Sequence, residues 1–166
     1  MFKNMEKFLI SLKEIFIKNN LTVSTGESCT GGLISSFLTD IDGASDFIQQ
    51  CFVTYSPKAK QRFLNVNPKT IEQYGVVSSE VAQQMTCGLL DYADIGIATT
   101  GYAAPNSGDE NNKGGCVYIG LGFNKKGNKI IRTFKYQSPC KTRVDIKKDF
   151  AKKAFEELII FLKNNI

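Results

Sequence analysis

Two candidate nucleophiles, Ser28 and Cys29, lie next to each other in the run Ser-Thr-Gly-Glu-Ser-Cys-Thr-Gly-Gly at residues 24–32. The run follows an apolar stretch typical of a strand and precedes a helix-like stretch. A ligand could therefore approach the backbone and the first N–H groups of the helix. On this local pattern alone, two interpretations stay open: a ligand-binding or nucleophile loop, and a purely structural helix start capped by Thr30.

The chain contains no histidine, so a nucleophile in this run needs another base. The last glycine of a G-x-S-x-G hydrolase elbow and the Gly-Lys-Ser/Thr of a Walker A loop are also missing from it. Lysine, glutamate, aspartate and tyrosine remain as candidate bases. A lysine with the usual pKa of about 10.4 is almost wholly protonated at pH 7, and it becomes a base only where burial or a neighbouring cation lowers that pKa.

Tyr55 and Lys60 belong to a second polar segment, Val-Thr-Tyr-Ser-Pro-Lys-Ala-Lys at residues 53–60, which begins where another predicted strand ends. Ligands of open α/β sheets bind at the carboxyl edge of the strands, and we expect both polar segments to meet there. By residue type alone, however, Tyr55 and Lys60 are expected at the surface.

The elements that would position these residues alternate between helices and strands. Hydrophobic periodicity and turn residues predict helices over residues 2–18, 30–40, 58–64, 68–74, 78–92 and 143–164. They predict strands over residues 21–26, 47–55, 95–100, 116–123 and 129–136, the last two as a hairpin. The polar, glycine-rich residues 101–115 form a long loop. The pattern predicts one three-layer α/β/α domain with a mixed sheet over residues 1–166.

Composition narrows the class of protein. The chain has 42% hydrophobic and 22% charged residues, no apolar run of membrane-spanning length and no secretory signal. The five cysteines (29, 51, 87, 116 and 140) form no CxxC pair, which favours free thiols in the cytoplasm over disulfides or a metal site. Residues 125–166 carry 12 Lys and Arg against 4 Asp and Glu, a net charge of +8. We interpret this charge as a solvated helix face rather than a nucleic-acid site.

Several motifs in one order together resemble the CinA C-terminal domain family. They are Glu-Ser-Cys-Thr-Gly-Gly at 27–32, Gly-Ala-Ser at 43–45, Val-Thr-Tyr-Ser at 53–56 followed by Lys60, Gly-Val-Val-Ser at 75–78, and Thr-Gly at 100–101 followed by Pro105. The resemblance runs from about residue 5 to residue 163. Longer family members carry a further N-terminal domain, for which this chain has no room, so we expect a stand-alone domain.

The resemblance implies a nicotinamide mononucleotide (NMN) deamidase, an amidohydrolase of pyridine nucleotide recycling. Such an enzyme converts NMN and water to nicotinic acid mononucleotide and ammonia, without a metal or an organic cofactor. By motif, Ser28 is the nucleophile, and Tyr55 and Lys60 are its catalytic partners. The other residues assigned to substrate binding are Glu27, Cys29, Thr30, Gly31, Gly32, Thr100, Gly101 and, for the phosphate, Arg143. The resemblance also implies a homodimer.

The sequence departs from the family pattern after residue 100. Where the family has Thr-Gly-Ile-Ala-Gly-Pro-Gly-Gly, this chain has Ala104 and Asn106 in place of two glycines, and Tyr102 in place of a smaller aliphatic residue. Alanine lacks the conformational freedom of glycine, so we expect an altered loop in which Tyr102 fills pocket space. Two alternatives stay open. One is a catalytically weak CinA-like protein that binds a nucleotide or acts as a partner protein associated with competence or DNA damage. The other is an amidohydrolase for another pyridine or amide.

Overall fold

A five-stranded mixed sheet forms the centre of the protein, whose computed structural model describes residues 2–166 and the side chains from Met5 onward. Its strands are β1 (Val23–Glu27), β2 (Ile48–Val53), β3 (Ile95–Tyr102), β4 (Cys116–Lys125) and β5 (Asn128–Gln137). In the order β2-β1-β3-β4-β5, β1 runs parallel to β2 and β3, whereas β4 is antiparallel to β3 and β5. The mixed sheet and the terminal hairpin are as the sequence predicts.

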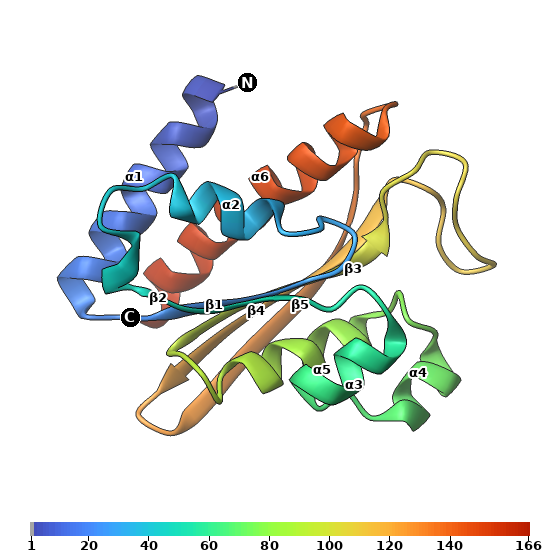
Figure 1. The fold of residues 1–166 in the computed structure, drawn as a ribbon, viewed down its shortest axis with the longest axis horizontal. Coiled ribbons are helices and arrows are strands. Elements are labelled where there is room, and N and C mark those ends of the chain that lie inside the picture. Colours follow the sequence, from blue (N-terminus) through green and yellow to red (C-terminus); the bar gives the residue numbers. More distant parts are fainter. Residues whose placement is uncertain (1) are drawn as a thin grey trace.

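Helices cover both faces of the sheet and give the three predicted layers (Figure 1). One face carries α1 (Phe2–Asn19), α2 (Leu33–Thr39) and α6 (Arg143–Asn165). The other face carries α3 (Pro57–Leu64), α4 (Pro68–Tyr74) and α5 (Ser79–Leu89). A short 3₁₀ turn, η1 (Ala44–Asp46), leads into β2.

Two hydrophobic clusters hold these layers together, one on each face of the sheet. The larger includes fully buried side chains such as Phe16 of α1 and Phe150 of α6, which recur at the helical spacing seen in the sequence. The smaller joins Leu64 at the end of α3 to Leu89 of α5. Gly88 lies against the backbone of Leu64, with no room there for a side chain. The helix that carries Lys60 is thereby fixed closely against α5 and the sheet.

The start of α2 differs from the expected helix over residues 30–40. Gly31 and Gly32 have φ angles of 64° and 91°, in the left-handed region that glycine tolerates, and the helix begins only at Leu33. The hydroxyl of Thr30 forms a 2.8 Å hydrogen bond with that of Thr99 and does not cap the helix. The interpretation of this run as a helix start capped by Thr30 is therefore wrong. The tight turn keeps Ser28 directly at the end of β1.

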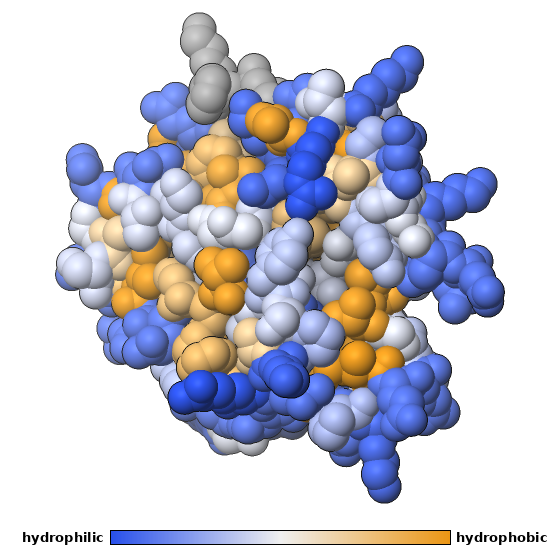
Figure 2. Space-filling model, turned by 45° about the vertical axis from the view of Figure 1, so that its right-hand side comes forward, coloured by the Kyte–Doolittle hydropathy of each residue, from blue (hydrophilic) through white to orange (hydrophobic). Residues whose placement is uncertain are grey.

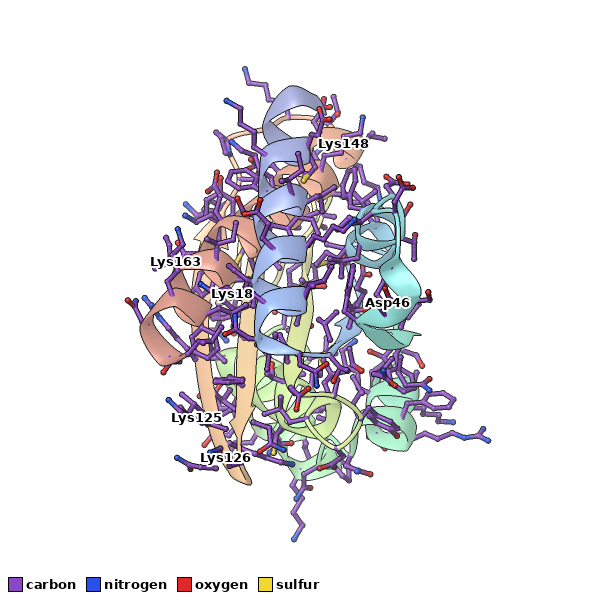
Figure 3. The ribbon with its side chains drawn as sticks, turned by 90° about the vertical axis from the view of Figure 1, so that its left-hand side faces the viewer. Lys18, Asp46, Lys125, Lys126, Lys148 and Lys163 are labelled. Atoms are coloured by element: carbon purple, nitrogen blue, oxygen red, sulfur yellow. The ribbon has the colours of Figure 1, made fainter. Side chains whose placement is uncertain are left out.

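Basic residues of the C-terminal part are spread over the length of the molecule. Lys148 and Lys163 lie toward opposite ends of α6, and Lys125 and Lys126 lie at the hairpin turn (Figure 3). The positive charge is therefore distributed rather than gathered at one place. Among the described residues, none of the helices combines the length and the apolar content needed to span a bilayer.

Candidate active site

The site begins where two neighbouring parallel strands end. Glu27 of β1 pairs with Val53 of β2, and the N–H of Thr54 donates to the carbonyl of Glu27 at 2.8 Å. The chain after β2 turns at once into α3, whose first turn is capped by Ser56 through a 3.1 Å bond from the N–H of Ala59. One helical turn on this path brings the side chain of residue 60 back to the strand ends.

Lys60 and Ser28 are in direct contact at this edge. The Lys60 Nζ donates to Ser28 Oγ at 2.9 Å and to the Thr54 carbonyl at 2.6 Å. Lys60 is 0% exposed and Ser28 is 8% exposed. The expectation from residue type that Lys60 lies at the surface is therefore wrong, because the packing of α3 against α5 and the sheet encloses its side chain.

Burial also changes the acid–base chemistry of this pair. Removal from water disfavours the ammonium form and lowers the pKa of Lys60 to about 8, an effect that the nearby Cys29 opposes only in part. Burial raises the pKa of Cys29 to about 12, so this thiol stays protonated at neutral pH. Because a thiol attacks as its thiolate, Ser28 is the better activated of the two neighbouring nucleophiles.

The carboxyl group of Glu27 closes the N-terminus of α2. It accepts bonds from the N–H groups of Gly32 and Ile34, both at 3.0 Å, and from the N–H and hydroxyl of Ser35 at 2.8 and 2.6 Å. Glu27 is fully buried, and these bonds satisfy N–H groups that helices leave without partners. Its geometry is that of a residue that shapes the loop rather than one that touches a ligand.

Two N–H groups of the loop remain for a ligand. Gly31 donates to the Ser28 carbonyl at 3.1 Å, and Gly32 donates to Glu27. Within residues 2–166, the recorded hydrogen bonds include none from the backbone N–H of Cys29 or Thr30. Of these two residues, which directly follow Ser28, only Cys29 lines the cavity beside Ser28, and its N–H is the candidate donor to an oxyanion.

A cavity of about 300 Å³ opens beside Ser28. Of the residues predicted to bind substrate, its lining includes Cys29, Thr100, Gly101 and Arg143, together with Tyr55. The remaining lining residues are Pro57, Val76, Val77, Tyr102, Ala103 and Ser107. Glu27, Thr30, Gly31 and Gly32 do not line it. The side of the molecule that carries this edge shows small apolar groups among hydrophilic residues (Figure 2).

Tyr55 and Arg143 form a second pair at the cavity. Tyr55 is 61% exposed, and its hydroxyl accepts a 3.2 Å hydrogen bond from the Arg143 guanidinium. Among the described residues, no recorded hydrogen bond joins Tyr55 to Ser28 or Lys60, so the serine–lysine contact is direct. Lys147, one helical turn after Arg143, reaches the loop itself: its Nζ lies 3.3 Å from the position that a Cβ on Gly31 would take.

The fold and the site define an α/β protein with a serine–lysine pair at the carboxyl edge of its sheet. Residues 5–162 match the model of the CinA C-terminal domain, and the chain belongs to that family. This confirms the resemblance read from the ordered motifs.

Curated relatives are longer than this chain. A putative competence-damage inducible protein of Acetivibrio thermocellus is 46% identical over 110 residues, which cover 65% of this chain and 27% of the relative. A CinA-like protein of Chlorobium limicola is 38% identical over 149 residues, with 88% and 34% covered. The matched part of this chain thus spans about a third or less of their length.

Solved structures match the whole fold. The competence damage-inducible protein A of Klebsiella pneumoniae has a TM-score of 0.87 at 25% identity, and the match covers 98% of this chain and 99% of that one. The competence/damage inducible protein CihA of Agrobacterium tumefaciens has a TM-score of 0.83 at 34% identity, with 96% of each chain covered. These names describe competence and damage and do not state a reaction.

Proposed function

We propose that the protein is an amidohydrolase that hydrolyses the carboxamide of NMN, with Ser28 as nucleophile and Lys60 as base. The observation that carries the proposal is the 2.9 Å contact between Lys60 Nζ and Ser28 Oγ beside a cavity. A lysine with a pKa of about 8 is neutral in roughly one molecule in ten at pH 7. With an ordinary pKa, the neutral fraction would be several hundredfold smaller.

In the first half of the reaction, neutral Lys60 accepts the hydroxyl proton of Ser28 while Oγ attacks the carboxamide carbon. The carbonyl oxygen becomes an oxyanion, and the N–H group of Cys29 is the donor that would face it. Lys60 then passes its proton to the amide nitrogen, the C–N bond breaks, and ammonia leaves. A nicotinoyl ester on Ser28 remains.

In the second half, a water molecule takes the place of ammonia. Lys60 accepts a proton from this water as it attacks the ester carbon. The bond to Ser28 Oγ then breaks, the serine recovers its proton from Lys60, and nicotinic acid mononucleotide is released. One base serves both steps, so no histidine is required.

The charges of NMN suit the two sides of the cavity. Its pyridinium withdraws electrons from the carboxamide, and a cation near Lys60 would lower the pKa of that lysine further. Its phosphate is an anion of the kind that arginine binds. Arg143, held by the Tyr55 hydroxyl, lines the cavity. In this proposal Tyr55 orients Arg143 toward the phosphate.

The test is hydrolysis of NMN by purified protein, followed as ammonia release and as formation of nicotinic acid mononucleotide by chromatography. We expect Ser28→Ala to lose turnover by at least a hundredfold while still binding NMN, because only the attacking atom is removed. Ser36→Ala is the matched control, since that serine lies exposed on α2. Turnover at the wild-type rate in Ser28→Ala would refute the assignment of Ser28 as nucleophile. If wild-type protein binds NMN but forms no product, the protein binds NMN without hydrolysing it and the proposal is refuted.

A further inference from the structure

The carboxyl group of Asp109 accepts several hydrogen bonds within the loop after β3. Asp109 Oδ1 accepts from the N–H groups of Asn111 and Asn112 at 2.9 and 2.7 Å. The Asn112 side chain is buried and donates to the carbonyl of Val77, a residue that lines the cavity, at 3.0 Å. The loop is thus tied to a residue of the cavity lining.

The same carboxyl group holds an aromatic ring at the cavity. Tyr102 is the last residue of β3, and its carbonyl accepts from the N–H of Gly115 at 2.7 Å, which fixes its backbone. Its hydroxyl donates to Asp109 Oδ2 at 3.0 Å. Tyr102 therefore lines the cavity with its backbone and its ring tip both fixed.

The protonation states make this wall electron-rich. Burial, together with the hydrogen bond to Asp109, raises the pKa of Tyr102, so the phenol keeps its proton. Burial opposes ionisation of Asp109, but the bonds from Tyr102, Asn111 and Asn112 outweigh it and lower the pKa of this carboxyl. A neutral phenol that donates to a carboxylate carries added negative charge on its ring, and ring faces attract cations.

The lining of the cavity therefore offers two kinds of contact. Tyr102, bonded to the Asp109 carboxyl group, offers an electron-rich ring, and Arg143 offers a positive charge. Ser28 lines the same cavity. A ligand with a cationic aromatic ring and an anionic tail would match both residues, whereas a ligand with a neutral ring would match only Arg143.

We infer that Tyr102, positioned by Asp109, is the residue that selects a positively charged pyridine ring as the substrate of this site. The inference rests on the proposed function, because it concerns the ring that bears the carboxamide attacked by Ser28. It assigns to Tyr102 a direct contact with the ring and to Asp109 the orientation of Tyr102.

The test compares NMN with its reduced form, which keeps the carboxamide, ribose and phosphate but has a neutral dihydropyridine ring. Binding is measured by calorimetry in the Ser28→Ala protein, so that no turnover interferes. We expect this protein to prefer the oxidised form, and we expect Tyr102→Leu on the same background to lower that preference about tenfold. Tyr102→Phe should lower the preference less than Tyr102→Leu does, because the ring remains but its contact with Asp109 is lost.

Two further variants sharpen the comparison. Asp109→Asn should lower the preference without removing the ring, and Tyr92→Leu, which replaces a tyrosine outside the cavity lining, should leave it unchanged. An unchanged preference in Tyr102→Leu would overturn the inference. Tighter binding of both forms by that variant would also overturn it, because Tyr102 would then only fill space.

Failure of the inference and failure of the proposed function give different results. If wild-type protein releases ammonia from NMN but Tyr102→Leu keeps the preference for the oxidised form, only the role of Tyr102 is refuted. If the preference depends on Tyr102 but wild-type protein releases no ammonia from NMN, the proposed hydrolysis is refuted and the selection of a cationic ring by Tyr102 is supported. Equal binding of both forms by the Ser28→Ala protein would refute selection of a cation.

Discussion

Replacement of the buried lysine should change how the stability of the protein depends on pH. Lys60 is fully buried, and its folded-state pKa of about 8 lies below its usual value of 10.5. Below pH 8 the lysine is charged in both the folded and the unfolded chain, and the folded chain bears the cost of burying that charge. Between pH 8 and 10.5 the unfolded chain binds more protons, so the free energy of unfolding rises with pH.

The size of the effect follows from the two pKa values. A pKa that falls from 10.5 to about 8 corresponds to roughly 3 kcal/mol, and about 2–3 kcal/mol is regained between pH 7 and pH 10. Lys60→Met keeps an unbranched side chain but has no proton to lose. From pH 7 to pH 10, the free energy of unfolding of wild-type protein should therefore rise by about 2–3 kcal/mol relative to that of the variant.

Urea unfolding of both proteins at pH 7, 8, 9 and 10 measures this difference. Loss of the bonds to Ser28 and Thr54 shifts the variant equally at each pH, and groups such as Cys29 titrate in both proteins, so these effects largely cancel in the comparison. Lys58→Met, which replaces an exposed lysine of the same helix, is the matched control and should follow wild type. A constant difference between Lys60→Met and wild type from pH 7 to 10 would refute the lowered pKa and with it the lysine base.

Two further predictions follow from the same site. For NMN hydrolysis, kcat/KM should rise nearly tenfold per pH unit below the Lys60 pKa of about 8 and level off above it; a flat profile of initial rates from pH 6 to 9 would contradict a lysine base. Glu27→Gln should lower the free energy of unfolding by about 1–3 kcal/mol, because the N–H groups of α2 lose a charged acceptor. Urea unfolding of the wild-type and Glu27→Gln proteins measures this loss, and Asp40→Asn, at the exposed C-terminal end of α2, is the control. Equal free energies of unfolding for Glu27→Gln and wild type would contradict the capping role.

Periodicity predicted the fold well because most elements bury a regular face. The apolar residues of α1 and α6 recur at helical spacing, and the nearly all-apolar β3 lies at the centre of the sheet with its residues 95–100 buried. The ends of the helices and strands were predicted less accurately. The helix after Ser28 starts three residues late because Gly31 and Gly32 adopt left-handed φ values that periodicity does not reveal.

The burial of Lys60 could not be predicted from local sequence. Its helix contains Lys58, Gln61 and Arg62, and such a polar segment is typical of an exposed surface. Burial arises from long-range packing, since α5 approaches α3 closely at Gly88. The family motifs name Ser28 and Lys60 together, and the structure adds the direct contact between them and the burial of Lys60.

The position of Glu27 completes the explanation of a histidine-free site. A carboxylate next to a lysine would hold its ammonium form and raise its pKa, which would remove the base. Glu27 directly precedes Ser28, yet its carboxyl group is occupied by the N–H groups at the start of α2. Among the described residues, the recorded salt bridges include none to Lys60, whose oxygen partners are a hydroxyl and a carbonyl. An imidazole titrates near neutral pH by its own chemistry, whereas this lysine does so because the fold buries it and keeps the nearest carboxyl group engaged elsewhere.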